Sequence, residues 1–182
     1  WSISREHRDR WVNEMKSKGE NPFDNLAQLL FASSAIGEPL GADQILASLA
    51  TGKITEDKKV WEVANWIADK GTPDHLQKLL NLAQKTNSVG QQHAYLNAML
   101  TAKKIRKMNP SGGLDSVLKF LQSENHTVWS TAVELAGLWK LDSSRTTLET
   151  ILKKPDSKQV RKSAAINSLL AMGGEKTRKF FD

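Results

Sequence analysis

The sequence predicts an all-α protein, built as an α-solenoid of about five antiparallel helical hairpins in a curved right-handed array. Strand signals are weak, because valine and isoleucine are sparse and the chain contains a single tyrosine. Apolar residues recur at spacings of three and four, as they do on one face of an α-helix. A two-helix segment also recurs along the chain, which is typical of a helical repeat protein.

Caps and helix breakers divide the chain into short helices. Gly71 is expected to end one helix in the left-handed conformation, while Thr72 caps the next helix and Pro73 begins it. Asp156 and Gln159 have the spacing of a capping box. The expected helices span residues 3–17, 23–35, 42–51, 56–70, 73–85, 89–107, 113–123, 127–140, 144–153, 158–172 and 175–181. Because most links are short, neighbouring helices are expected to be antiparallel.

Three segments of the chain can be superposed on one another. Each begins at a valine, has an alanine four residues later on the same helical face, and has an apolar residue of the next helix sixteen residues further on. The three sets are Val60, Ala64 and Leu80; Val128, Ala132 and Leu148; and Val160, Ala164 and Phe180. The interval from Val60 to Val128, which we call the two-unit spacing, is about twice the interval from Val128 to Val160. These intervals fit two units and one unit of a repeat of about 34 residues.

The missing unit is expected around Ala94, with Leu118 and Leu121 on its second helix. Its first helix is expected to be long, continuing to Met108. One hairpin cannot bury its apolar stripe alone, so the hairpins are expected to stack and share a continuous core. The small alanine side chains would let the paired helices approach closely.

The third segment resembles a known family. Val160–Leu170 begins with Val-Arg, continues with small residues and leucines, and is followed by Gly173-Gly174. This pattern resembles the first helix and turn of a HEAT repeat, and Val128–Leu141 is a looser match. The resemblance covers roughly residues 56–182.

This resemblance implies a HEAT/ARM-like superhelix and a single repeat domain over residues 1–182. Within it, residues 1–54 are expected to form irregular helices and residues 55–182 regular repeats. The family implies a non-catalytic protein-binding module, or a spacer and scaffold between neighbouring domains.

The beginning of the chain has a second resemblance. Residues 7–12, His-Arg-Asp-Arg-Trp-Val, are similar to the HEAT-like segment of large exported bacterial proteins that combine a dehydrogenase-like propeller with a c-type cytochrome domain. This likeness implies a multidomain fragment in the periplasm or outside the cell. A first residue of Trp1 rather than Met also indicates a fragment of a longer protein. The haem motif of those proteins is absent from this sequence.

Charge is unevenly distributed along the chain. The 182 residues have a formal net charge of +6. Residues 1–98 contain 11 Lys and Arg against 12 Asp and Glu, a balance of −1, whereas residues 99–182 contain 15 against 8, a balance of +7. The excess indicates either an anionic partner or the solvated faces of exposed helices. No apolar run approaches the length of a membrane-spanning helix, so membrane insertion is not expected.

The sequence shows no set of residues typical of catalysis or of metal binding. There are no cysteines, which excludes disulfides and thiolate chemistry in this segment. His7, His75, His93 and His126 do not have the spacing of metal ligands, and no serine lies in a nucleophile-elbow motif. We therefore expect no catalytic residue, no cofactor and no metal, and the chain is not expected to be an enzyme.

The candidate partner-binding residues are Trp66 and four basic side chains. Trp66 lies off the main apolar stripe of its helix, which is compatible with either burial between neighbours or exposure as a recognition anchor. If Lys104 and Lys107 aligned with Arg161 and Lys162, they would form a basic groove. Such a groove suits the nucleic acid backbone, which is the alternative to a protein partner or to neighbouring domains of the same chain.

Overall fold

The computed structural model describes residues 10, 14, 17–18 and 38–182. Over these residues the chain forms helices and no strands, as predicted. The helices are α3 (Glu38–Ala50), α4 (Asp57–Lys70), α5 (Pro73–Lys85), α6 (Val89–Arg106), η1 (Leu114–Gln122), α7 (His126–Leu138), η2 (Asp142–Ser144), α8 (Arg145–Lys153), α9 (Gln159–Met172) and α10 (Gly174–Phe181). The helices predicted for 3–17 and 23–35, and the motif at residues 7–12, lie outside the described residues.

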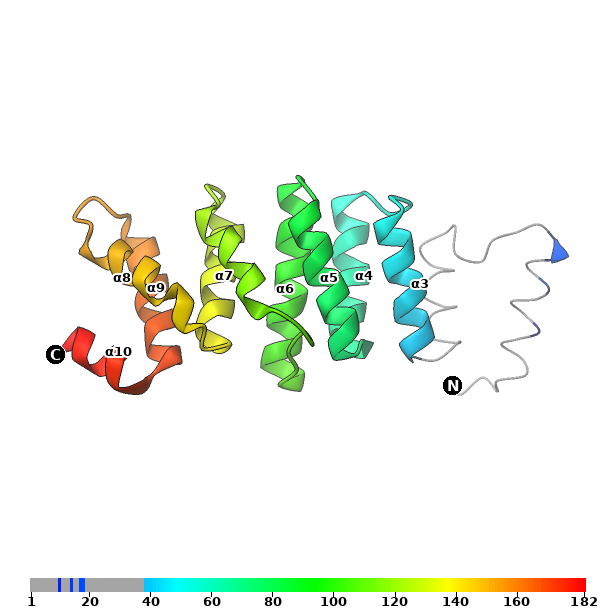
Figure 1. Cartoon of the computed structure of the whole chain (residues 1–182). Helices are drawn as coiled ribbons and strands as arrows, with labels where there is room; N and C mark the ends of the chain where they lie inside the picture. The colour runs from blue at the N-terminus through cyan, green and yellow to red at the C-terminus, as the bar shows by residue number, and fades with distance from the viewer. Residues whose placement is uncertain (1–9, 11–13, 15–16, 19–37) are drawn as a thin grey trace.

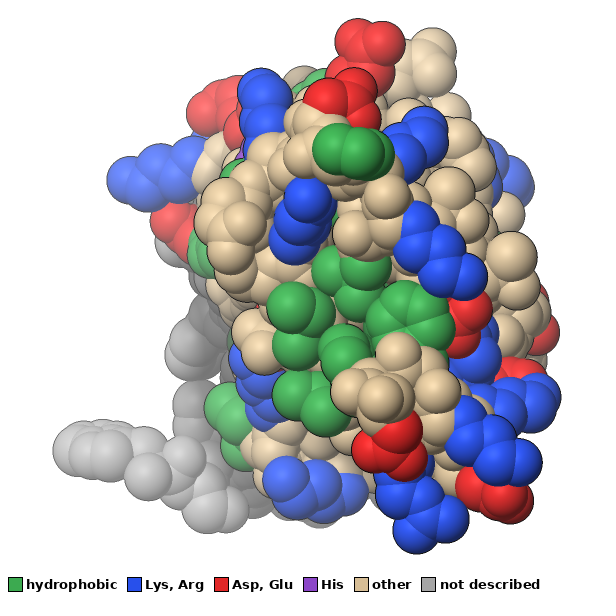
Figure 2. All heavy atoms as spheres, turned by 90° about the vertical axis from the view of Figure 1, so that its left-hand side faces the viewer, with side chains coloured by type: hydrophobic (Ala, Val, Ile, Leu, Met, Phe, Trp, Pro, Cys, Tyr) green, Lys and Arg blue, Asp and Glu red, His purple; other side chains and the backbone are tan. Residues whose placement is uncertain are grey.

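The helices follow one another along the molecule, as Figure 1 shows. One set, which we call the first row, consists of α4, α6, α7 and α9, and each member packs against the next. The helices α3, α5, η1 and α8 lie behind the first row. Among them, α3 packs on α5, and α5 contacts η1. The helices α5, η1 and α8 each also pack on a helix of the first row. Figure 2 views the molecule from the end at which α8, α9 and α10 lie.

The helices α4 and α6 run in the same direction. Near their beginnings, the Ser88 hydroxyl donates to the Asp57 carboxylate at 3.2 Å. Near their ends, the Arg106 guanidinium donates to the carbonyl oxygens of Ala68 at 3.0 Å and Gly71 at 2.8 Å. Arg106 therefore satisfies carbonyl groups that the end of α4 leaves without a helical partner.

The predicted two-unit spacing agrees with the pattern of burial. Each buried position of α4 has a buried counterpart in α7 at this spacing. The pairs are Val60 and Val128, Val63 and Thr131, Ala64 and Ala132, Ile67 and Leu135, and Ala68 and Ala136. The second-helix positions Leu80 and Leu148 are also fully buried, and Phe180 packs against the core.

The predicted register of α9 is wrong by one position. Val160, expected in the core, is 49% exposed, and Ala164 is only partly buried. Ala165 and Leu169 are fully buried instead, so they are the counterparts of Ala132 and Ala136 on α7. This register puts Arg161 where α7 has Val128. The Arg161 guanidinium lies over the ring of buried Trp129, 4.9 Å from its centroid.

Two predicted helix ends also differ from the structure. Gly71 has φ −71° and ψ 163°, so it is extended rather than left-handed. Its lack of a side chain still matters, because a Cβ there would lie 2.6 Å from the Ile67 carbonyl oxygen. The capping box expected at Asp156 is absent, since α9 begins after Lys158 without a side-chain cap.

The capping role predicted for Thr72 is confirmed. Its hydroxyl accepts from the His75 backbone N–H at 3.4 Å, and its own N–H donates to His75 Nδ1 at 3.0 Å. The element expected at 113–123 is a 3-10 helix, and the long helix predicted for the irregular unit is α6.

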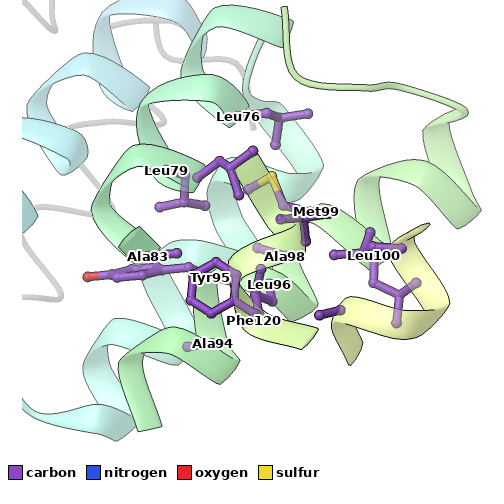
Figure 3. Packing of buried hydrophobic residues seen from close by; sticks show 14 of the residues in the cluster. Leu76, Leu79, Ala83, Ala94, Tyr95, Leu96, Ala98, Met99, Leu100 and Phe120 are labelled. Atoms are coloured by element: carbon purple, nitrogen blue, oxygen red, sulfur yellow. The ribbon is translucent and has the colours of Figure 1, made fainter. Parts of the chain in front are cut away.

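The core lies between the first row and the helices behind it. In Figure 3, Leu76 and Leu79 of α5 face Leu96 and Met99 of α6, and these four side chains are at most 1% exposed. Each buried side chain of this size contributes about 1.5–3 kcal/mol of transfer free energy. Apolar contact between the two layers is therefore the main stabilising interaction of the described chain.

The helices α7 and α9 lie close together at Gly137. A Cβ at this position would lie 2.8 Å from the Ser168 Cα, and the Ser168 hydroxyl donates to the Val133 carbonyl oxygen at 2.8 Å. We expect Gly137→Ala to lower the free energy of unfolding by about 2 kcal/mol, because the steric cost exceeds the gain in helix propensity. Urea denaturation measures this difference. Gly113→Ala is the control, since a Cβ there meets nothing within 4 Å, and equal stability of the two variants would contradict the close contact.

Tyr95 provides a test of core burial by titration. It is the single tyrosine, it is 3% exposed, and burial raises its pKa from 10.0 to about 12. Between pH 10 and 12 the unfolded chain is ionised at this residue and the native chain is not. Stability should therefore fall by about 1.4 kcal/mol per pH unit over this window. Tyrosinate absorbance measures the pKa directly, and Tyr95→Phe should remove this part of the pH dependence; ionisation of the native chain near pH 10 would contradict it.

Candidate protein-binding surface

One line of positions crosses the first row on its solvent side. Buried positions of α4 correspond to buried positions of α6; Val63, for example, corresponds to Ala98. The positions of α4 that correspond to those of α7, and the positions of α7 that correspond to those of α9, are described above. The same registers relate Trp66, Thr101, Glu134 and Asn167, one on each helix of the row. We call the surface around these four positions the row face.

The row face is hollowed between α7 and α9. A groove of about 300 Å³ is open to solvent at this place. Its lining includes Ser130, Glu134 and Leu138 of α7 and Ala164, Asn167 and Ala171 of α9. The lining therefore mixes apolar side chains with polar ones and contains one charged group, Glu134.

Apolar side chains lie on the row face beside this groove. Trp66 is partly buried and packs against the core, so one part of its ring is covered and another part is open to solvent. One turn along the row face, Ile105 is 74% exposed, and its counterpart on α7, Leu138, is partly exposed. Partly covered aromatic side chains are common anchors in protein interfaces.

Lys104 and Lys107 lie together at the end of α6. The Lys104 ammonium forms an ion pair of 2.5 Å with the Glu134 carboxylate, which joins α6 to α7 across the row face. Lys107 ends the helix in the left-handed conformation, with φ 57°, and its ammonium donates to the Lys104 carbonyl oxygen at 2.8 Å. Both side chains remain exposed at the surface.

Arg161 and Lys162 lie at the beginning of α9. Arg161 stacks on Trp129 and donates to the Ser123 carbonyl oxygen at 3.5 Å, while Lys162 donates to the Pro155 carbonyl oxygen at 3.2 Å. Arg161 meets the beginning of α7, whereas Lys104 meets its second half. The two basic pairs therefore lie toward opposite ends of the first-row helices and do not converge in one groove.

The shifted pKa values belong to groups away from the groove. A hydrogen bond from Lys78 lowers the pKa of Asp43, and one from Lys176 lowers the pKa of Asp142. Burial lowers the pKa of His93, whose ring lies 5.1 Å from that of Trp61. Glu134 is the single titratable residue that lines the groove, and its carboxylate is paired with Lys104.

The described residues hold no cluster suited to a metal ion. No three side chains of the metal-ligating types His, Cys, Asp and Glu come together among them. None of the helices in this part of the chain has the length and hydropathy needed to cross a bilayer. No protein-family model, no curated protein and no solved structure matches the chain.

Sequence reasoning missed three residues of this surface, Ile105, Glu134 and Asn167. Ile105 had a visible signal, because it is an isolated apolar residue within the basic run 103–107. Glu134 and Asn167 are recognised only through the helix registers. The register of α9 is shifted by one position from the predicted one. The sequence did not show this shift, because its pattern predicts Val160 to be a core residue.

Two substitutions separate structural roles from surface roles in the basic set. Arg161→Ala should lower the free energy of unfolding by about 1–2 kcal/mol, because it uncovers Trp129. Lys104→Ala should change it by less than about 0.5 kcal/mol, since it removes only an exposed ion pair. Thermal and urea denaturation measure both values, and a larger loss at Lys104 than at Arg161 would reverse these assignments.

Proposed function

We propose that this chain is a HEAT-like α-solenoid module of about five helical hairpins that binds a protein partner and is not an enzyme. In a longer protein the same module would also hold neighbouring domains apart. The proposal is supported by the burial pattern that recurs between α4 and α7 and by first-row helices that each pack on the next. Repeat arrays built in this way use an extended surface for recognition.

The observation that carries the proposal is the composition of the row face. A partly exposed tryptophan, an exposed isoleucine and an open groove lie along one side of adjacent helices. The charged groups Lys104 and Glu134 beside them are paired with each other. A partner can therefore gain apolar contact there without leaving a buried charge unpaired.

A second candidate function is binding to the backbone of nucleic acid. It is favoured by the balance of +7 over residues 99–182 and by the basic run at the end of α6. Against it, Arg106 is engaged with carbonyl groups of α4, and the two basic pairs are separated. The protein partner is therefore the function that we prefer.

We expect the row face to be required for capture of a native partner. The wild-type chain, the double variant Trp66→Ala/Ile105→Asp and the control Val89→Ala are compared as affinity baits in an extract of the source cells. Val89 is 45% exposed at the beginning of α6. A partner retained by the wild type and by the control should be lost by the double variant, provided that circular dichroism shows equal helicity. Retention by all three would contradict the proposal.

Nucleic acid binding is tested on the same proteins by fluorescence anisotropy with a 20-base-pair DNA duplex. A backbone binder that makes six to ten phosphate contacts loses about 10³–10⁵-fold in affinity between 50 and 200 mM salt. We expect no binding at 200 mM salt that is tighter than about 10⁻⁵ M. Submicromolar binding with a steep salt dependence, lost in Lys104→Ala/Lys107→Ala, would favour the second candidate instead.

A further inference from the structure

Exposed apolar side chains gather at the end of the molecule formed by α8, α9 and α10, which we call the end face. Of the five large hydrophobic residues that are exposed in the described structure, Val160, Leu170 and Phe181 are on α9 or α10. Figure 2 shows a hydrophobic patch in the middle of this face, with Lys and Arg side chains and some Asp and Glu side chains around it. Leu152 of α8 and Phe180 of α10 are partly buried at the same end of the core.

The register of the row explains why α9 presents this surface. In this register, Ile166 and Leu170 on α9 take the positions that Val133 and Gly137 have on α7. On α7 these positions are covered by α9, since Ser168 donates to the Val133 carbonyl oxygen and lies against Gly137. On α9 the same positions are open, because Ile166 is partly exposed and Leu170 is 58% exposed. The end face is thus the surface on which a further helix would pack.

The segment that forms this surface has a positive net charge. Residues 145–182 contain nine Lys and Arg and four Asp and Glu, a balance of +5. Glu175 is already paired with Lys179 at 2.8 Å. Among the described residues, no ion pair is formed by the exposed Lys154, Lys158 and Arg178, and none is formed by Glu149, Asp156 or Asp182. The net balance of this segment therefore stays positive.

We propose that the end face binds an amphipathic α-helix of a protein partner, with aliphatic residues on one side and acidic residues on both flanks. The occupant is a helix because the equivalent stripe of α7 is covered by a helix. Its flanks are acidic because the rim is basic, and opposite charges favour encounter and register. A second copy of this chain is a poor occupant, since its own end face has the same positive charge.

The shape of the end face also restricts the partner. Leu170 stands where α7 has Gly137, so an incoming helix cannot approach as closely as α9 approaches α7. A small residue opposite Leu170 would restore a normal interaxial distance of about 8–10 Å. We therefore expect a partner helix with alanine or glycine at the centre of its apolar stripe.

The inference rests on the proposed protein-binding function but uses a surface separate from the row face. The probe is a synthetic 21-residue helical peptide with leucine and a central alanine on one side and glutamate on both flanks. A matched peptide has lysine in place of every glutamate. Binding to the whole chain is measured by fluorescence anisotropy at 50 and 300 mM NaCl.

The acidic peptide should bind, and its affinity should fall several-fold at the higher salt concentration, because the rim charges are screened. The lysine peptide should bind at least about tenfold more weakly. Leu170→Asp should reduce the affinity for the acidic peptide by about tenfold or more, because it places a carboxylate in the apolar patch. Val89→Asp, a similarly exposed position outside both surfaces, should leave the affinity unchanged.

Four results would overturn the inference, and the fourth would leave the proposed function standing. One is equal binding of the two peptides, and another is no effect of Leu170→Asp in a chain that circular dichroism shows to be folded. The third is a dimer in sedimentation velocity that Leu170→Asp dissociates, since a second copy would then be the occupant. The last result is the absence of peptide binding at the end face. If the row-face variant at the same time loses capture of the native partner, this inference alone is rejected and the proposed function stands.

Discussion

The structure depends on direct contact between successive helices of the first row. The contact of α7 with α9 requires a residue without a side chain at Gly137, because Ser168 occupies the space that a Cβ would need. At the beginning of α6, Gly90 is less constrained, because a Cβ there would meet only the side-chain carboxylate of Asp57 on α4, which can move. Close approach lets each helix bury one stripe against the previous helix and another against the layer behind. The aligned solvent side of the row follows from this contact.

This contact also explains how far the sequence could predict the fold. The all-helical class and the two-unit spacing follow from apolar periodicity, and the described helices agree with both. The register of α9 could not be read from its valine, because Arg161 replaces an aliphatic residue by stacking its guanidinium on Trp129. A cation that packs as an apolar group does not appear in a hydrophobic pattern. The extended geometry of Gly71 was missed for a related reason, since glycine serves there for space rather than for positive φ.

The candidate site was less predictable than the fold. Trp66 was identified from its place off the apolar stripe, and the structure leaves it partly covered and partly open. The basic residues were grouped by charge alone, and charge does not show which end of a helix a residue occupies. Because the first-row helices run in the same direction where their end contacts are known, the end of α6 and the beginning of α9 are separated by about the length of a helix. Ion pairs such as Lys104 with Glu134 form between side chains that sequence order does not place together.

Within the first row, each helix contacts the helix before it and the helix after it. Such a row has no central point at which all parts meet, so a small tilt at one contact adds to the tilts at the others. A force applied at the two ends would therefore be shared among many small rotations before any core contact broke. The described row of helices would therefore lengthen under tension by small rotations, while its individual helices stay folded.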